Sequence, residues 1–494
     1  MNGFEDFGAY IVSQGPLENT TTDFWRMVWQ QKAQAIVMLT NLEEKGRLKC
    51  HCYWPQDGSL SKHGSLCVAH QSTTVYADYV LRRFVVSMDD DVDNKSLDVV
   101  QYHYISWPDH GVPTDTGSVL NFLTRIRRNK NSNSGPMIVH CSAGVGRTGA
   151  FITIDTMLQR LAIQGDVDVY NYVLKLRERR VFMVQTAEQY IFIHQTIRDA
   201  IQWGDTSIPV SALKDYVTYK MEYVNGFKGQ FDMLGKCPVL DESAAQKPTN
   251  MTKNRYRNYI PNNSFRVTLS LPAFGRSSDY INASHVSSLL HKDFFKIAQT
   301  PVEESVEDFW RMMWDQRCSI VVLMCHLRQG DEEHCFQFWP DSDVLKFKTF
   351  HVELEKETKG EHVTVREMKL VHSKTSTSNP ITCFHFLDWP CEDKPPESAE
   401  SLVSLIVDVQ KQQVQSGNRP MAVICNNGVG RSGVFACLYS TIERMRCDRM
   451  VDIFQTVRAM RLQRSRLISN LELYKFCYKG ALEYVSLFKD NDDD

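Results

Sequence analysis

The sequence predicts an α/β protein of two tandem domains, each built on a mixed sheet that is flanked by helices. Two observations lead to this fold class. Strand-like and helix-like patterns alternate along the chain, and a long part of the sequence occurs twice. Residues 14–29 recur as residues 299–314, with Asp-Phe-Trp-Arg-Met in both copies. An offset of about 285 residues is far longer than a solenoid repeat, so it indicates a duplicated domain.

The elements of the first copy follow from the spacing of apolar residues. Short apolar runs predict strands at residues 34–41, 98–105 and 136–139. Helical spacing predicts helices at residues 150–161, 167–177 and 187–201. We also expect Cys50 and Cys52 to lie along a strand, because two cysteines so close together do not have the usual spacing of a structural zinc site.

Length and composition limit the class of protein. A chain of 494 residues can bury two full cores, and 43% hydrophobic with 23% charged residues is ordinary for a globular protein. The net charge of −3 gives no argument for nucleic acid or an anionic membrane as partner. The sequence lacks an apolar run of the roughly 18 residues that span a bilayer. The 14 cysteines show neither disulfide nor zinc spacing, so we expect reduced thiols and no metal.

The duplication also predicts where the two domains begin and end. We expect a first domain at residues 1–205, a linker leading into the second domain at 206–252, a second domain at 253–486 and an acidic tail at 487–494. Part of residues 235–252, which contain Pro238 and Pro248, should be a loop. In the second copy, a Lys-Asn-Arg-Tyr segment ends at Tyr256, well before Gln299. Only 13 residues precede Gln14, so the first domain has no room for this segment and should begin within the fold.

The segment from His140 to Gly149 predicts a cysteine nucleophile in an anion-binding loop. Cys141 follows the strand at 136–139 and Arg147 begins a helix. Gly144 and Gly146 allow successive N–H groups to point inward as a nest for an oxyanion. The helix N-terminus and the planar guanidinium add positive charge that suits a phosphate and favours a thiolate. Such a thiolate can attack phosphorus.

Asp109 is the candidate acid for the leaving oxygen. It lies in Trp-Pro-Asp-His-Gly-Val-Pro (107–113), where two prolines and a glycine predict a defined loop. Such a loop can close over a substrate and bring a carboxyl group to the ester oxygen.

Several further residues have both a catalytic and a structural interpretation. Gln185 and Gln189 are four residues apart, so one helical turn would place both on one face, either to orient water or as surface polar groups. His140 would tune the thiolate or be a buried structural histidine. Thr148 would assist departure of the thiolate or simply begin the helix. Glu44 or Lys45 would support Arg147 or the acid loop, or be solvated turn charges.

Together these motifs resemble the classical protein tyrosine phosphatases, in the tandem arrangement of receptor-type members, over nearly the whole chain. The resemblance implies a highly twisted mixed sheet with helices on both sides, and neither cofactor nor metal. Cys141 would form a phosphocysteine, with Asp109 as acid and then base, and Gln185 would position water. The phosphate would be bound by the loop residues Ser142, Ala143, Gly144, Val145, Gly146 and Arg147. The family's Lys-Asn-Arg-Tyr tyrosine, which lines the phosphotyrosine slot, is absent from the first domain.

The second copy keeps Cys425 and Arg431 but departs elsewhere. Ile424 replaces His140, and Asn426-Asn427 replaces Ser142-Ala143. Asp109 aligns with Cys391, followed by Glu392, and the glutamines align with Ser469 and Leu473. We therefore expect a catalytically silent second domain that docks on the first, binds partners or responds to oxidation at Cys425.

The predicted function is hydrolysis of phosphotyrosine in proteins. The main alternative is a non-catalytic phosphate- or protein-binding scaffold, because the first domain is short. A phosphatase of low specificity, acting on phosphoserine or lipids, is a weaker third reading. We expect a cytoplasmic location, as the cytoplasmic part of a single-pass receptor if the natural product carries an N-terminal extension.

Overall fold

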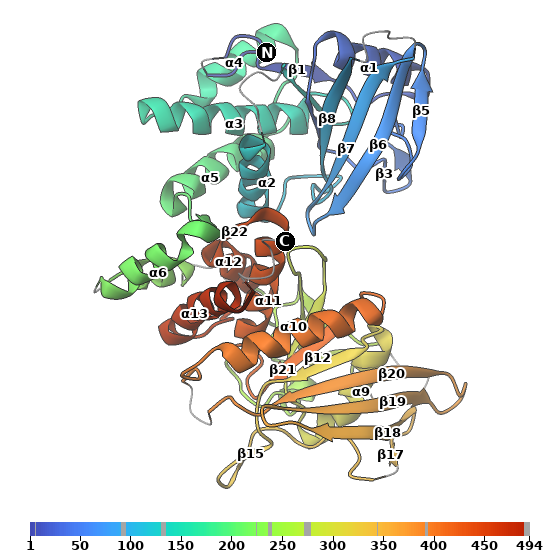
Figure 1. Ribbon diagram of the computed structural model, residues 1–494, viewed down its shortest axis with the longest axis vertical. Coiled ribbons are helices and arrows are strands. Elements are labelled where there is room, and N and C mark those ends of the chain that lie inside the picture. The colour runs from blue at the N-terminus through green and yellow to red at the C-terminus, as the bar shows by residue number, and fades with distance from the viewer. Residues whose placement is uncertain are drawn as a thin grey trace. The chain divides into compact units, whose positions relative to one another are not determined.

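A computed structural model describes residues 1–4, 6–89, 95–129, 135–223, 225–235, 240–270, 278–342, 344–390 and 394–488. The chain divides into two compact units, residues 1–205 (unit 1) and 206–494 (unit 2). Each unit has a mixed sheet with helices packed against it, which confirms the predicted α/β class (Figure 1). Cys391, Glu392 and residues 489–494 of the expected tail lie outside the described residues, whereas Leu487 and Phe488, also expected in the tail, end the last helix.

Over the described residues, unit 1 has a seven-stranded sheet in the order β1-β9-β2-β8-β7-β6-β5. The first four strands in this order are parallel to their neighbours, and the remaining neighbours are antiparallel. The strands of the sheet are β1 (Tyr10–Ser13), β2 (Ala35–Met38), β5 (Leu60–His63), β6 (Leu66–Val75), β7 (Tyr79–Met88), β8 (Ser96–Tyr104) and β9 (Met137–His140). A separate hairpin joins β3 (Glu43–Glu44) to β4 (Arg47–Leu48).

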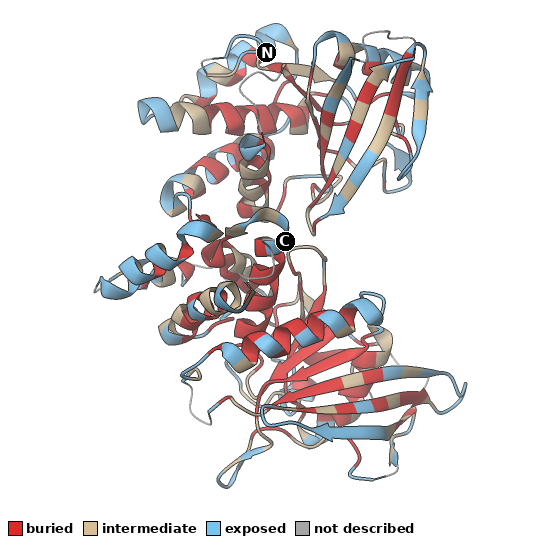
Figure 2. Ribbon diagram, in the orientation of Figure 1, coloured by how far each residue is buried: buried red, intermediate tan, exposed pale blue. Residues whose placement is uncertain are grey.

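The helices of unit 1 are η1 (Glu18–Thr20), α1 (Thr21–Gln30), α2 (Thr116–Arg128), α3 (Gly146–Gln164), α4 (Val169–Arg179) and α5 (Ala187–Trp203). Helices α2 to α5 lie together beside the sheet (Figure 1). Helix α1 places Phe24, Trp25 and Val28 in a core with residues of β2, β6, β7 and β8. The first three turns of α3 are buried all round (Figure 2), as expected for a helix with apolar residues on every face.

The expected strands at 34–41, 98–105 and 136–139 correspond to β2, β8 and β9, and the expected helices correspond to α3, α4 and α5. Helix α3 starts at Gly146, four residues before the predicted start, because the end of the anion-binding loop already has helical conformation. The strand expected around Cys50 and Cys52 was wrong. Both cysteines lie in irregular chain after β4, where Cys50 is buried and Cys52 is exposed.

Over the described residues, unit 2 has a nine-stranded sheet in the order β11-β12-β13-β21-β14-β20-β19-β18-β17. Its strands are β11 (Arg266–Thr268), β12 (Tyr280–Val286), β13 (Phe295–Gln299), β14 (Ile320–Leu323), β17 (Val344–Lys346), β18 (Phe350–Lys359), β19 (Val363–His372), β20 (Ser378–Phe386) and β21 (Met421–Cys425). Short pairs are β15 (Arg328–Gln329) with β16 (Glu332–Glu333), and β10 (Ile208–Pro209) with β22 (Met450–Val451). The helices are η2 (Val210–Ala212), α6 (Leu213–Glu222), α7 (Lys228–Leu234), α8 (Pro248–Met251), η3 (Glu303–Ser305), α9 (Val306–Asp315), α10 (Glu400–Gln415), α11 (Arg431–Asp448), α12 (Ile453–Gln463) and α13 (Leu471–Phe488).

The segment expected as a linker, residues 206–252, packs with unit 2. It contains β10, α6, α7 and α8, and β10 pairs with β22. Phe227 lies 4.4 Å from Tyr478 of α13 between ring centroids, and Tyr216 lies 6.2 Å from the same ring. Aromatic burial of this kind gives the segment its own tertiary contacts.

The two sheets differ next to the strand that precedes the duplicated helix. In unit 2, β13 pairs with β21 on one side and with β12 on the other, and β12 pairs with β11. In unit 1, the corresponding β1 pairs with β9, and no second strand pairs with it over the described residues. Tyr10 of β1 instead exchanges backbone hydrogen bonds with Met1.

Candidate active site

The anion-binding loop of unit 1 connects the end of β9 to the start of α3. Cys141 is the first residue after β9, and Arg147 lies in the first turn of α3. Because β2 and β9 are parallel, the residue that follows β2, Leu39, lies at the same sheet edge, where its N–H donates to the carbonyl of His140. The carboxyl end of a parallel strand followed by a helix N-terminus is a common place for an anion site.

The turn in the loop depends on Gly144, which has a φ of +70°. A Cβ atom at this position would lie 2.0 Å from the carbonyl oxygen of Ser13, so only glycine fits. The N–H of Gly144 points at Cys141 Sγ, 3.3 Å away. Cys141 is 5% exposed, so the sulfur forms the floor of the loop. A backbone N–H directed at the sulfur favours negative charge there.

Two carboxylate oxygens hold the guanidinium of Arg147. Its Nη1 donates to Glu44 Oε1 at 2.6 Å and its Nη2 to Glu44 Oε2 at 2.8 Å. The same guanidinium donates to the carbonyls of Leu39 at 3.0 Å and Pro108 at 3.0 Å. The planar group is therefore fixed in orientation, which suits bidentate recognition of phosphate. Of the two open candidates for this support, Glu44 makes the contact.

Asp109 lies near the same guanidinium, because its own carbonyl accepts from Arg147 Nη2 at 3.3 Å. Its Oδ1 is 2.8 Å from Lys49 Nζ. The hydrogen bond from Lys49 is the main cause that lowers the pKa of Asp109 to about 2, and Glu44, the charge of Lys49 and His110 act in the same direction. Without a bound anion the carboxyl group is thus held ionised. A phosphate dianion entering the loop would oppose that charge and raise the pKa of Asp109, which an acid role requires.

His140 is fully buried and belongs to a hydrogen-bonded chain. His140 Nδ1 lies 3.2 Å from the carbonyl of Cys141, and a carbonyl only accepts, so Nδ1 carries the ring hydrogen. His140 Nε2 then accepts from the Tyr53 hydroxyl at 2.9 Å, and Gln101 Nε2 donates to the same hydroxyl at 2.8 Å. Burial lowers the pKa of His140 to about 4. A neutral histidine therefore fixes the backbone at the nucleophile.

Gln185 and Gln189 converge on the loop although they do not share a helix face as predicted. Helix α5 begins at Ala187 with Thr186 as its N-cap, so Gln185 lies before the helix. Both side chains nevertheless approach Gly146, where an added Cβ would be 2.8 Å from Gln189 Nε2 and 3.3 Å from Gln185 Oε1. Gln189 Oε1 also accepts from the Gln185 N–H at 2.8 Å and from the N–H of the N-cap Thr186 at 3.4 Å, and the second bond caps the helix, while Gln185 is exposed.

The remaining predicted loop residues fall into two groups. Ser142 and Ala143 are exposed at the rim, and their carbonyls accept from Gly15 N–H at 2.9 Å and from Arg180 at 3.0 Å. Thr148 is fully buried, and its hydroxyl has no hydrogen-bond partner among the described residues.

Sequence reasoning missed three groups of this site. Lys49 contacts the acid, Tyr53 and Gln101 hold His140, and Arg177 donates to the carbonyls of Met183 and Val184 behind the loop. A lysine in a hairpin and a tyrosine after it carry no local pattern of their own. The second copy offers a signal for Tyr53, since the aligned residue there is Phe338.

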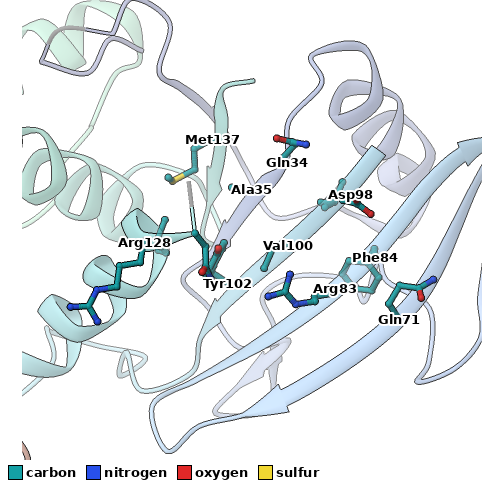
Figure 3. Close-up of a pocket in the computed structure, with 13 residues that line it drawn as sticks. Gln34, Ala35, Gln71, Arg83, Phe84, Asp98, Val100, Tyr102, Arg128 and Met137 are labelled. Carbon is teal, nitrogen blue, oxygen red and sulfur yellow. The ribbon is translucent and has the colours of Figure 1, made fainter. Parts of the chain in front are cut away.

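A cavity of about 470 Å³ lies elsewhere in unit 1. Its lining includes Ala35 and Met137, the first residues of β2 and β9, together with Arg128 at the end of α2 (Figure 3). Cys141 follows the last residue of β9, so this cavity opens at the other end of the parallel strands.

Over the described residues, no group of three or more His, Cys, Asp or Glu side chains could hold a metal ion. None of the described helices is both long and apolar enough to cross a membrane.

Comparison with known proteins gives the same result for both units. The sequence model of the protein-tyrosine phosphatase family matches residues 1–199 and 250–483. The chain belongs to the protein-tyrosine phosphatase family. It is 37% identical to human receptor-type tyrosine-protein phosphatase alpha over 99% of this chain and 62% of that protein. It is 35% identical to human receptor-type tyrosine-protein phosphatase epsilon over 99% and 72%. The Drosophila melanogaster tyrosine-protein phosphatase Lar is 39% identical over 99% and 24%.

These matches show that the chain carries two tandem domains of the protein-tyrosine phosphatase family and is similar to receptor-type members. The chain spans about three fifths of the length of the alpha phosphatases it matches.

The second domain keeps the backbone contacts of the loop arginine but has different side chains around the loop. Arg431 donates to the carbonyls of Met324 and Pro390, as Arg147 does to Leu39 and Pro108. A Cβ at Gly430 would approach Leu473 and Ser469, which stand where Gly146 meets the two glutamines. The chain Gln101–Tyr53–His140 is replaced as a set by the apolar residues Cys383, Phe338 and Ile424.

Proposed function

We propose that unit 1 hydrolyses phosphotyrosine in proteins through a phosphocysteine intermediate, and that residues 1–205 are the catalytic domain. The observation that carries the proposal is the grouping of Cys141, Arg147 and Asp109 around one loop. The Gly144 N–H approaches the sulfur at 3.3 Å, and Arg147 contacts the carbonyls of Pro108 and Asp109. A nucleophile, a bidentate cation and a carboxyl group are what this reaction needs.

In the first step the Cys141 thiolate attacks phosphorus. An S–P bond forms, the P–O bond to the tyrosyl ring breaks, and Asp109 gives its proton to the leaving oxygen. The loop N–H groups and Arg147 neutralise charge on the three other phosphate oxygens. Binding of the phosphate dianion favours the protonated form of Asp109, against the effect of Lys49.

In the second step water attacks the phosphocysteine. Gln185 orients the water, Asp109 accepts its proton, the S–P bond breaks and inorganic phosphate leaves. Gln189 supports Gln185 by accepting its N–H at 2.8 Å. Thr148, whose buried hydroxyl directly follows Arg147 in the chain, assists departure of the thiolate, and His140 fixes the backbone at Cys141.

We propose that the second domain, residues 253–486, is silent in this reaction. Cys425 and Arg431 remain, but the aligned positions of the acid, the water-positioning glutamine and His140 have lost their chemistry. Contact between the domains stays a prediction of the sequence. Because these relatives are named receptor-type, we propose that both domains lie on the cytoplasmic side of a membrane.

The test is hydrolysis of a phosphotyrosine peptide by the whole chain, by Cys141→Ser and by Cys425→Ser, with thermal unfolding of each. We expect activity to vanish with Cys141→Ser and to survive Cys425→Ser, with intact unfolding transitions. A folded parent chain without turnover would contradict the proposal and favour the scaffold. Equal rates on a matched phosphoserine peptide would contradict tyrosine specificity.

A further inference from the structure

In the second domain, a side-chain oxygen lies inside the anion-binding loop. Asn427 Oδ1 accepts from the N–H groups of Val429 at 3.0 Å and Gly430 at 3.1 Å. It also lies 3.4 Å from Cys425 Sγ. These two N–H groups belong to the nest between the cysteine and the arginine. A single side-chain oxygen therefore contacts both the sulfur and the donors that an oxyanion would use.

The corresponding position in the first domain leaves this space open. Ala143 stands where the second domain has Asn427, and alanine has no side-chain acceptor. The two loops otherwise turn alike, since Gly144 has a φ of +70° and Gly428 a φ of +65°. The Asn427 carboxamide is thus a side-chain acceptor that the similarly turned loop of the first domain does not have at this position.

The surroundings of the second loop remain positively charged. Arg431 is buried at its helix start, and Gln329 occupies the hairpin position where Glu44 binds Arg147 in the first domain. Arg464 is fully buried beneath the loop, where its Nε donates to the carbonyl of Gly428 at 2.7 Å. The same guanidinium donates to Asn282 Oδ1 and Ser284 Oγ, which are neutral as well. A neutral amide oxygen satisfies the loop donors without adding negative charge beside these arginines.

An internal oxygen competes well with a dissolved anion. Asn427 is within three residues of both donors, so its effective concentration at the loop is high and it loses little entropy on binding. A phosphate must first displace it and break two hydrogen bonds of ordinary strength, which corresponds to about 10- to 100-fold in affinity.

We propose that Asn427 closes a latent site for tetrahedral oxyanions in the second domain, by placing its Oδ1 where an oxygen of the anion would bind. The inference rests on the proposed silence of this domain and gives it a physical cause beyond the missing acid. Without the Asn427 side chain, the loop binds oxyanions but does not hydrolyse phosphate esters.

The experiment measures protection of Cys425 by tungstate in the whole chain. Iodoacetamide labels accessible thiolates, and peptide mass spectrometry reports Cys425 separately from Cys141. We expect tungstate to leave the labelling rate of Cys425 unchanged in the parent chain. In Asn427→Ala we expect faster labelling of Cys425 and about 10-fold or greater protection by tungstate.

Matched variants separate the oxygen from other effects. Asn427→Asp keeps an acceptor at the same place and should behave as the parent chain. Asn426→Ala changes the neighbouring side chain and should do the same. The pair Asn426→Ser with Asn427→Ala copies Ser142-Ala143 of the first domain and replaces Asn427→Ala if the single variant does not fold.

Tungstate protection of Cys425 in the parent chain would overturn the proposal, because the loop would then be open. Absence of protection in a folded Asn427→Ala variant, or in the folded pair, would also overturn it. Turnover of a phosphotyrosine peptide is recorded on each sample and should not change. Loss of turnover in the parent chain counts against the proposed function, while Cys425 protection is still measured independently.

Discussion

Glu44 holds Arg147 by a two-pronged ion pair, with N–O distances of 2.6 and 2.8 Å. The Glu44 side chain is 4% exposed and the Arg147 side chain 12%. Thr40 also donates to the carboxylate at 3.1 Å, so the group is held from both sides. A hairpin residue about 100 positions away in sequence therefore determines how the guanidinium faces the loop.

Glu44→Gln tests this relationship, because Gln329 is the natural residue at the same position of the second domain. The amide keeps one acceptor oxygen but loses the charge, which leaves the guanidinium partly uncompensated. We expect a loss of about 1–3 kcal/mol in the free energy of unfolding and about a tenfold or greater fall in kcat/KM. Thermal unfolding and peptide hydrolysis measure both. Glu43→Gln, at an exposed neighbouring position, should change neither.

Lys49→Met should move the pH dependence of turnover. Lys49 is the main group that lowers the pKa of Asp109, so its removal raises that pKa and increases the protonated fraction of Asp109 at a given pH. An acid must be protonated to act, and activity falls as pH rises through its pKa. The descending limb of the kcat/KM profile should therefore move to higher pH. The control is Lys45→Met in the same hairpin, and an unmoved limb in Lys49→Met would contradict the role of Asp109.

The sequence predicted the nucleophile loop and the acid loop because each is contiguous. Cys141 to Arg147 and Trp107 to Pro113 carry their chemistry in a few neighbouring residues, with glycine and proline marking the turns. The strands and helices around them also followed from apolar spacing, although α3 began earlier than predicted because the loop passes directly into the helix.

Contacts between distant segments were outside the reach of such patterns. Lys49 meets Asp109, and Tyr53 meets His140, across 60 and 87 residues. Nothing in the local sequence of a hairpin says which carboxyl group or ring it will touch. The wrong strand at Cys50 has the same cause, since its burial comes from tertiary packing rather than from alternation along a strand.

Tyr53→Phe removes the hydroxyl between Gln101 and His140. Both partners would then be buried without a hydrogen bond on that side, so we expect a loss of about 1–3 kcal/mol in the free energy of unfolding. Turnover should fall because His140 no longer fixes the carbonyl of Cys141. The mirrored variant Phe338→Tyr places a hydroxyl among Cys383 and Ile424 and should also destabilise, without affecting turnover. Unchanged stability in Tyr53→Phe would show that the chain of bonds does not matter.

Gln185→Ala should separate the two chemical steps. If Gln185 orients the water, its loss slows hydrolysis of the phosphocysteine more than its formation, by the 10²–10⁴-fold range in which positioned proton-transfer and water contacts act. Rapid-quench kinetics should then show a burst of one tyrosyl product per enzyme, followed by a slow steady rate. Gln189→Ala tests the supporting role and should also lower stability, since Gln189 caps α5. A uniform fall of both steps in Gln185→Ala would argue against water positioning.

Gly144→Ala should abolish activity, because the added Cβ would clash with β1 and distort the anion-binding loop. Its Cβ would lie 2.0 Å from the Ser13 carbonyl, and a φ of +70° is itself unfavourable for alanine by about 1–2 kcal/mol. Gly165→Ala is the matched control, because Gly165 has a φ of +76° at the end of α3 but no atom within 4 Å of its Cβ position. We expect the control to lose only the stability that a positive φ costs an alanine, and to keep its kcat. In Gly144→Ala, β1 must move away from the loop or the loop must unwind, so kcat/KM should fall about 100-fold or more. Equal effects of the two substitutions would mean that backbone conformation alone, and not the close approach of β1, constrains the anion-binding loop.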